Sequence, residues 1–520
     1  MIRVGIDVGG TNTDAVVMRG REVLCGLKTP TTADVIGGVA QALRDVVAGA
    51  GVARTQIGAV MIGTTHFTNA LVERRKLSRV GVLRLALPAT RGLPPGSDWP
   101  EDFQAAVEMH WRLAHGGYEY DGRPLGTPDP AEILGHARAF ADLGLKDIAV
   151  SGAFSILNDA QETAAAELIR QVIPDARLTL SSQIGRLGLL ERENAAILNA
   201  CLGPLGLEVI AAFRQALAES GITAPFYLTQ NDGTLMAAEQ AARFPILTVA
   251  SGPTNSMRGA AFLSGEKNAI VVDIGGTTSD VGVLQGGFPR QAGVAVEVGG
   301  VRTNFRMPDV YSIGLGGGSL VASDFGSLGP QSVGYAIHSK ALVFGGGTLT
   351  ATDIAVAAGV ARLGDPTRVA DLPWNGVRTC YELLQLMVFN AVERMRTSAE
   401  PLPVIVVGGG SILLGDELRG QPVTTPPHFG CANAVGAAMA QVSGEVDRVM
   451  DLDKFSREEA IAIVREAAET RAVAAGAARD TLAVIDVEDV PLAYIGGNAT
   501  RIRVRVVGDL NEQATKGGSA

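Results

Sequence analysis

Two segments of the chain carry the same order of residue types. Residues 6–14 read Ile-Asp-Val-Gly-Gly-Thr-Asn-Thr-Asp, and residues 272–280 read Val-Asp-Ile-Gly-Gly-Thr-Thr-Ser-Asp. Each predicts a buried strand, a turn at the paired glycines and a return strand. Paired glycines let backbone N–H groups approach an anion, and a carboxylate at the end of a buried strand can hold Mg²⁺ beside phosphates. The doubled pattern therefore predicts two phosphate-binding loops.

The residues expected at the phosphates follow from these two loops. A single Gly-Gly-Thr turn would fit an ordinary hairpin equally well, but two copies in the same context are hard to obtain by chance. The expected phosphate contacts are Gly9, Gly10, Thr11, Asn12 and Thr13 in the first loop and Gly275, Gly276, Thr277, Thr278 and Ser279 in the second. The strand-end carboxylates expected to hold Mg²⁺ are Asp7 and Asp273.

A third glycine-rich loop follows the apolar strand expected at residues 404–407. It consists of Gly408, Gly409, Gly410 and Ser411, and its bare backbone suits the adenosine end of a nucleotide. Third in order after two phosphate loops, it lies where the actin/sugar-kinase/Hsp70 superfamily keeps its adenosine loop. Neither G-x-x-x-x-G-K-[ST] nor a G-x-G-x-x-G after a first strand occurs. The sequence therefore predicts ATP as the ligand.

The elements that must position these loops predict an α/β fold. We expect two actin-like (ribonuclease H-like) domains flanking an ATP cleft, with a small C-terminal α/β extension, at residues 1–185, 186–450 and 451–520. A long helical stretch over residues 191–220 should break at Pro204. In the C-terminal extension, a capping box at Ser456 and Glu459 predicts a helix start. A strand at 501–506, joined to the preceding strand at 496–498, alternates strictly and predicts one buried and one solvated face.

Composition narrows the class of protein. The 520 residues are 47% apolar and 19% charged and include 65 glycines, which fits a protein with several packed units and many tight turns. A net charge of −10 without a dense basic stripe argues against nucleic acid as a partner. Neither a secretory signal nor a membrane span is expected. Four scattered cysteines form no metal or disulfide pattern, so a reducing cytoplasm is the expected location.

Several further segments resemble one family of this superfamily, the A-type hydantoinase/oxoprolinase proteins. The segments lie at residues 63–65 and 68–74, 180–182, 231–233 and 251–253, and 307–319. The last, Met-Pro-Asp-Val-Tyr-Ser-Ile-Gly-Leu-Gly-Gly-Gly-Ser, is the most distinctive. Two positions depart from the family's pattern: Ile62 and Tyr311 stand where many members have histidine.

The resemblance implies ATP-dependent opening of a cyclic amide such as a hydantoin, a lactam or 5-oxoproline. The A-type chain would transfer the γ-phosphoryl group to the amide oxygen, with Asp7 and Asp273 organising Mg²⁺ and Asp14 or Asp280 orienting substrate or water. A B-type partner subunit and an oligomeric enzyme are also implied. The residues expected near the substrate are Thr64, Thr65, His66, Asp309, Gly317, Gly318 and Ser319.

Two other functions use the same loops. One is a kinase of a small metabolite, such as a sugar or a carboxylic acid. The other is an ATP-gated regulatory or chaperone-like module. The segment at residues 307–319 favours the cyclic amide hydrolase, and the absence of a separate peptide-binding domain disfavours the regulatory module.

Overall fold

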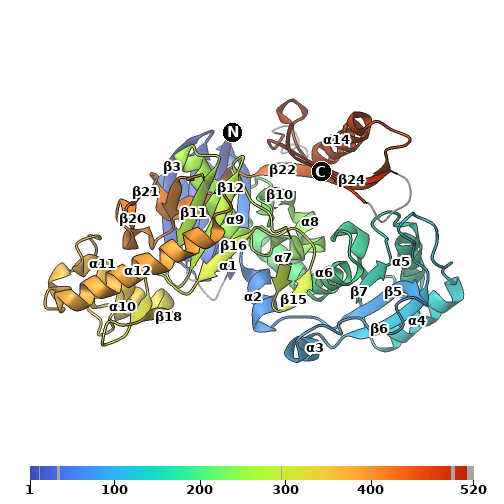
Figure 1. Ribbon diagram of the computed structural model, residues 1–520, viewed down its shortest axis with the longest axis horizontal. Coiled ribbons are helices and arrows are strands. Elements are labelled where there is room, and N and C mark those ends of the chain that lie inside the picture. The colour runs from blue at the N-terminus through green and yellow to red at the C-terminus, as the bar shows by residue number, and fades with distance from the viewer. Residues whose placement is uncertain (11, 32–34, 294–295, 399, 493–497, 512–520) are drawn as a thin grey trace.

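A computed structural model describes residues 1–10, 12–31, 35–293, 296–398, 400–492 and 498–511 (Figure 1). Its two large sheets share one strand order, a three-stranded antiparallel run followed by two strands parallel to its first member. In the first sheet the order is β3 (Glu22–Pro30), β2 (Asn12–Arg19), β1 (Ile2–Val8), β4 (Ile57–Thr64) and β9 (Phe226–Thr229). In the second it is β13 (Phe288–Pro289), β12 (Ser279–Gln285), β11 (Ala269–Ile274), β19 (Val404–Val407) and β21 (Gln421–Thr424). The duplication seen in the sequence is therefore a duplication of architecture.

The two predicted hairpins form with matching registers. Asp7 lies opposite Asp14 across β1 and β2, and Asp273 lies opposite Asp280 across β11 and β12. Both hairpins bring the chain back at the same point, so the two loops occupy equivalent ends of their sheets. The predicted turns and strands at residues 6–14 and 272–280 are confirmed for the described residues.

The C-terminal segment completes the first sheet. Strands β22 (Gln441–Asp451), β24 (Ala499–Gly508) and β23 (Ala483–Pro491) continue it beyond β10 (Thr234–Ala237), giving nine strands. The sheets thus run across the segments expected at 1–185, 186–450 and 451–520, because β9, β10 and β22 to β24 all join β1. Helix α14 (Arg457–Ala474) covers these strands and begins at the predicted capping box of Ser456 and Glu459. Residues 496 and 497 of the expected turn lie outside the described residues.

The expectation of one solvated face on β24 is wrong. Ile502, Val504 and Val506 pack under α14, as alternation requires. The opposite face is also covered, because Arg503 and Arg505 are buried and paired. Arg503 lies beside Asp486 and Glu488 of β23, and Arg505 donates to the Asp232 carbonyl at 3.3 Å. The alternating arginines of β24 therefore lie on a second interior face of the strand and not on a solvated one.

A smaller parallel sheet stands beside the first (Figure 1). Its order is β6 (His110–His115), β5 (Gly81–Leu87), β7 (Asp147–Gly152) and β8 (Arg177–Leu180). Helices α4 (Pro130–Asp142) and α5 (Ala160–Val172) pack on it. The remaining short strands are β14 (Val296–Val298), β15 (Val301–Thr303), β16 (Val310–Ile313), β17 (Ser319–Val321), β18 (Leu328–Ser332) and β20 (Glu417–Leu418).

Helices cover the large sheets and supply most of the core. Pro204 lies in the first turn of α7 (Gly203–Glu219), directly after α6 (Leu189–Cys201), which confirms the predicted break. Among the described residues no single helix is long and apolar enough to cross a membrane, and by those two criteria only the α6–α7 pair, bent by 52°, could. The other helices are α1 (Val35–Gly49), α2 (His66–Glu73), α3 (Glu101–Val107), α8 (Ala238–Arg243), α9 (Ser251–Ser264), α10 (Ile337–Lys340), α11 (Ala351–Ala357), α12 (Trp374–Met395) and α13 (Ala432–Ala438).

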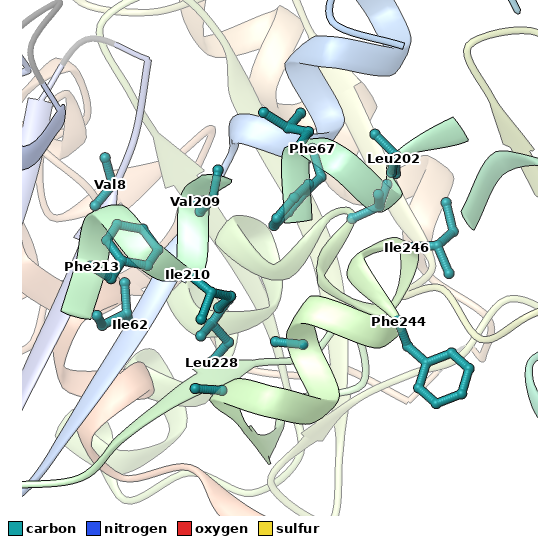
Figure 2. Packing of buried hydrophobic residues seen from close by; sticks show 14 of the residues in the cluster. Val8, Ile62, Phe67, Leu202, Val209, Ile210, Phe213, Leu228, Phe244 and Ile246 are labelled. Atoms are coloured by element: carbon teal, nitrogen blue, oxygen red, sulfur yellow. The ribbon is translucent and has the colours of Figure 1, made fainter. Parts of the chain in front are cut away.

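The largest apolar cluster lies between the first sheet and α7 (Figure 2). Figure 2 shows Ile62 of β4 close to Phe213 of α7, and both side chains are fully buried. Fully burying a side chain of this size contributes about 1.5–3 kcal/mol. Position 62, histidine in many A-type proteins, therefore belongs to the core of this chain.

Helices α9 and α13 cross at unusually close range between the two large sheets. A Cβ atom on Gly259 of α9 would lie 1.9 Å from the Ala432 carbonyl oxygen, and one on Gly436 of α13 would lie 1.8 Å from the Asn255 carbonyl oxygen. A Cβ on Gly5 of β1 would lie 2.1 Å from the Ala434 carbonyl oxygen. Only glycine fits at these contacts because the obstructing atoms are backbone.

Gly259→Ala is expected to lower the free energy of unfolding by about 1–3 kcal/mol, because the helices must separate to admit the methyl group. Chemical denaturation monitored by circular dichroism measures this change. Gly252→Ala on the same helix is the control, since nothing lies within 4 Å of its Cβ position. Equal stability of the two variants would contradict the packing described above.

Candidate functional site

The two Gly-Gly loops close in the same way. The Gly9 N–H donates to the Asn12 carbonyl at 3.0 Å, and the Gly275 N–H donates to the Thr278 carbonyl at 2.9 Å. In both loops the second glycine is open: nothing lies within 4 Å of a Cβ built on Gly10 or Gly276. Each loop therefore presents bare backbone at its tip. Thr11, expected to contact phosphate, lies outside the described residues.

The hydroxyl groups expected to donate to phosphate are partly engaged inside the protein. Ser279 is buried and its Oγ donates to the Leu315 carbonyl at 2.6 Å. Thr13 is also buried, with its Oγ1 3.2 Å from Thr31 Oγ1. Asn12, Thr277 and Thr278 keep accessible surface. The accessible donors of these loops are thus mainly backbone groups and the residues next to the glycines.

A hydrogen-bond network joins the strand-end carboxylates of the two sheets. Asn255 of α9 donates to Asp7 Oδ1 at 3.0 Å, and Asn433 of α13 donates to Asp7 Oδ2 at 3.3 Å. The Ser256 hydroxyl lies 2.5 Å from Asp273 Oδ2 and 2.9 Å from Asn433 Oδ1. The crossed helices therefore hold Asp7 and Asp273 in one connected group.

Four carboxylates in this region have raised pKa values. Burial raises the pKa of Asp273 to about 7 and the pKa of Asp14 to about 6. Burial also raises the pKa values of Asp7 and Asp280, although hydrogen bonds from Asn255 and Ser312, respectively, oppose this. Removing a carboxylate from water disfavours its charged form, and a bound cation would restore it. The arrangement is thus suited to a positively charged ligand.

Lys28 supplies the nearby positive charge and was not predicted from the sequence. It lies on β3 directly opposite Asp14, and its Nζ is 2.7 Å from Asp14 Oδ1 and 3.0 Å from Oδ2. Its charge acts on Asp7 and Asp273 as well, lowering both pKa values against the effect of burial. The side chain remains 34% exposed. The signal that could have found it is its place opposite Asp14 across the second hairpin turn.

The third glycine loop packs against the second loop. Gly408 has a φ of +86°, and a Cβ there would lie 2.2 Å from Asp273 Oδ1. The Gly410 N–H donates to the Ile274 carbonyl at 2.7 Å. Only Lys28 Cε, at 3.9 Å, lies near a Cβ position on Gly409, so this backbone is open and faces the first half of the molecule. Ser411 is buried, and its Oγ has no hydrogen-bond partner among the described residues.

The expected substrate residues at the end of β4 lie beside the first loop. Thr64 pairs with Val8 in the parallel register of β1 and β4, and the Thr65 N–H and hydroxyl both lie 3.2 Å from the Val8 carbonyl oxygen. His66 Nδ1 is 2.5 Å from Thr64 Oγ1. Burial lowers the pKa of His66, which favours the neutral imidazole. The structure thus brings Thr64, Thr65 and His66 to the first loop.

The segment at residues 307–319 lies against the second loop. The N–H groups of Gly317 and Gly318 donate to the Gly275 and Gly276 carbonyls at 3.0 and 2.8 Å. Ser319 is buried and its Oγ accepts from the Gly316 N–H. Gly317, Gly318 and Ser319 therefore support the second loop, and these polar groups are already hydrogen-bonded within the protein.

The side chains at the start of that segment point elsewhere. Asp309 pairs with Arg290, whose Nη2 lies 2.7 Å from Asp309 Oδ2. Tyr311, histidine in many A-type proteins, lies under the Arg394 guanidinium, 4.4 Å from its ring centroid. Both residues are thus occupied by arginines of neighbouring segments.

A cavity of about 960 Å³ opens beyond the end of β9. Its walls come from the loops after β7, β8 and β9, from β22 and from α14. Polar and charged groups dominate them, including Arg186, Asp232, Arg306 and Glu445. Parallel α/β sheets bind ligands at the carboxyl ends of their strands, and three such ends meet here. Of these cavity residues the sequence had singled out only Ser182, Asn231 and Asp232, from the segments at 180–182 and 231–233.

Paired sheets of one topology, each with a Gly-Gly loop after its first strand, make this an actin-like α/β protein. The solved structure of ATP-dependent caprolactamase from Pseudomonas jessenii has the same fold, with a TM-score of 0.79 at 20% identity over 98% of this chain and 88% of that one. The sequence matches the profiles of the hydantoinase/oxoprolinase N-terminal region over residues 3–173 and of hydantoinase/oxoprolinase over residues 192–365. The chain belongs to the hydantoinase/oxoprolinase family.

Two curated relatives are subunits of larger enzymes. Caprolactamase subunit alpha from Pseudomonas jessenii is 26% identical over 381 residues, covering 69% of this chain and 54% of that protein. The acetophenone carboxylase gamma subunit from Aromatoleum aromaticum is 27% identical over 250 residues, covering 46% and 34%. The match thus spans about half of the first relative and a third of the second.

Asp273→Asn is expected to stabilise the protein in a pH-dependent way. The pKa is about 7 in the folded state against 3.8 unfolded, so the stability associated with the proton is present below pH 3.8 and is lost as pH rises through 7. Asparagine carries no charge, so at pH 8 the variant should gain about 4 kcal/mol in free energy of unfolding, and the gain should shrink towards pH 4.

Urea denaturation at pH 8 and at pH 5 measures this difference. Asp371→Asn, at an exposed carboxylate, is the control and should change stability at neither pH. A gain from Asp273→Asn that is the same at both pH values would contradict a raised pKa at this position.

Proposed function

We propose that this chain binds Mg-ATP between its two Gly-Gly loops and phosphorylates the amide oxygen of a cyclic amide. The observation that carries the proposal is the matched pair of loops, each closed by the same backbone hydrogen bond and each open at its second glycine. Open backbone at two turns suits an anion of several phosphates. The third loop, open at Gly409, accepts the adenosine end.

Lys28 and the carboxylates have different electrostatic roles in the proposed site. Lys28 is partly exposed beside both halves and neutralises charge on the transferring phosphoryl group. Asp7 and Asp273 fit a hydrated Mg²⁺. Burial raises the pKa values of both carboxyl groups, and a nearby cation would stabilise their charged forms. The described residues contain no group of three His, Cys, Asp or Glu side chains placed to hold a metal directly. Asp7 and Asp273 would hold the ion, which when bound would withdraw charge from the phosphates.

The proposed chemistry turns a poor electrophile into a reactive one. The amide oxygen bonds to the γ-phosphorus while the bond to the β,γ-bridging oxygen breaks, ADP leaves with that electron pair and the amide proton is lost. Water adds to the activated carbon, and the ring carbon–nitrogen bond breaks with the pair and a proton going to nitrogen. A second water hydrolyses the acyl phosphate to carboxylate and phosphate. Asp14 or Asp280 orients the substrate or water.

The proposal includes a partner subunit. Caprolactamase subunit alpha and the acetophenone carboxylase gamma subunit are parts of larger enzymes, which supports a B-type partner for the hydrolytic half and an oligomeric complex. We place the activity in the cytoplasm, where the four free cysteines would stay reduced. The domain division at 1–185, 186–450 and 451–520 remains part of the proposal.

ATP consumption by the purified chain tests the reaction. We expect ADP release with hydantoins or lactams, and ring opening only when a B-type partner is added. The panel also includes sugars and, because one relative is a ketone carboxylase subunit, acetophenone with bicarbonate. A phosphorylated sugar or a carboxylated ketone as the product would refute the cyclic amide as the substrate.

Valine at the open glycines tests the nucleotide site. Gly10→Val and Gly276→Val should fold normally, because nothing lies within 4 Å of either Cβ position, yet weaken ATP binding at least tenfold by filling the space over the backbone. Gly347→Val is the control, an exposed glycine with the same free space in a loop outside the site. Nucleotide affinity from calorimetry and melting temperature are the readouts. Unchanged affinity in both site variants would exclude these loops as the ATP site.

A further inference from the structure

Two arginines six positions apart at the cavity end of β8 differ sharply in their bonding. Arg192 is buried and donates from all three of its guanidinium nitrogens, to the Ser181 hydroxyl and to the carbonyls of Arg186, Gly188 and Gly152. Such an arginine is part of the framework. The Arg186 side chain lines the cavity of about 960 Å³, and its Nη2 is buried without a hydrogen-bond partner among the described residues.

The charges around Arg186 leave its cation undercompensated. Its pKa is lowered to about 10, first by burial and then by Arg503 and Arg501, and the acids Asp447 and Glu488 only partly oppose this. Those acids are themselves engaged, Asp447 with Arg501 and Glu488 with Arg503. A buried guanidinium with an unused N–H group is costly unless an anion completes it.

Arg306, a second cation of the cavity wall, is already neutralised. Arg306 lies 3.2 Å from Asp232 Oδ2 and pairs with Glu445. Lys454 pairs with Asp451, Arg471 donates to the Glu445 carbonyl, and Arg448 is exposed. Among the described cations of the wall, Arg186 is therefore the one with a buried N–H group left without a partner. The planar guanidinium matches a carboxylate, which it can hold through two parallel N–H groups.

The cavity lies close to the phosphoryl-transfer site. Asn255 Nδ2 is 3.0 Å from Asp7 Oδ1 and also 3.0 Å from Thr229 Oγ1. Gln230, the next residue, lines the cavity. Two hydrogen bonds and one residue step separate Asp7 from the cavity wall, a distance on the order of 10 Å. The cavity wall and the strand end that carries Asp7 are thus joined through Asn255.

We propose that this cavity is the acceptor pocket and that Arg186 binds a carboxylate carried by the cyclic amide. The proposal rests on the function proposed above and narrows it from cyclic amides in general to those with an acidic substituent. Uncharged lactams leave the Arg186 N–H group unpaired and bind weakly.

Calorimetric titration of the full chain without ATP or partner tests the pocket separately from the reaction. The probes are pairs that differ in the carboxylate: 5-oxoproline with 2-pyrrolidinone, and hydantoin-5-acetate with 5-methylhydantoin. In at least one pair the acid should bind ten times more tightly or better. Arg186→Gln should remove that preference, and Arg186→Lys should reduce it. Arg170→Gln, at an exposed arginine outside the cavity, should preserve it.

Melting temperatures separate binding from folding. Arg186→Gln should melt no lower than the unmodified chain, because it removes a buried cation lacking full compensation, whereas Arg192→Gln should melt lower. A lower melting temperature for Arg186→Gln would make Arg186 a framework residue and overturn the proposal. So would equal binding within both pairs, or inorganic phosphate binding more tightly than either acid. Absence of ATP turnover alongside carboxylate binding would refute only the reaction.

Discussion

The structure depends on joining the strand-end carboxylates of its two large sheets in one hydrogen-bond network. Asp7 and Asp273 lie at the ends of the first strands of their sheets, and among the described residues neither forms an ion pair with an arginine or a lysine. Instead Asn255, Ser256 and Asn433 link them through two helices. Neutral donors stabilise the charged carboxylates less than a cation would. A bound cation would therefore stabilise this site further. Gly63 leaves room for the Asp7–Asn255 bond, since a Cβ there would lie 2.2 Å from Asp7 Oδ1.

Local patterns were enough to predict the hairpins, the break at Pro204, the helix start at Ser456 and the three glycine loops. Each of these depends on residues that are neighbours in the chain. The helix residues that link the loops could not be found this way, because Asn255 and Asn433 meet Asp7 only after α9 and α13 cross. Lys28 needed the register of a second hairpin turn. The solvated face expected for β24 failed because Arg503 and Arg505 find partners on other segments, which alternation alone does not reveal.

Charged residues line the interior beside the first sheet, whereas the apolar core lies on its other side. The arginines of β24 and the acids of β22 and β23 form ladders across neighbouring strands, and the cavity opens next to them. Cross-strand pairs of opposite charge stabilise a sheet when directly opposed. Here they also shape the electrostatic environment of Arg186 and Arg306. The C-terminal strands are therefore both a structural completion of the sheet and a wall of the cavity.

That completion has a consequence for how the protein is made. Strand β10 emerges from the ribosome long before β22, its partner on the open side, and the whole second sheet is translated in between. The first sheet must therefore wait with an unpaired edge while its neighbour folds, which slows assembly and exposes a strand to wrong partners. Because β10 has only four residues, that edge offers little backbone for pairing with other chains during the delay. The short strand can thus act as a safeguard during biosynthesis.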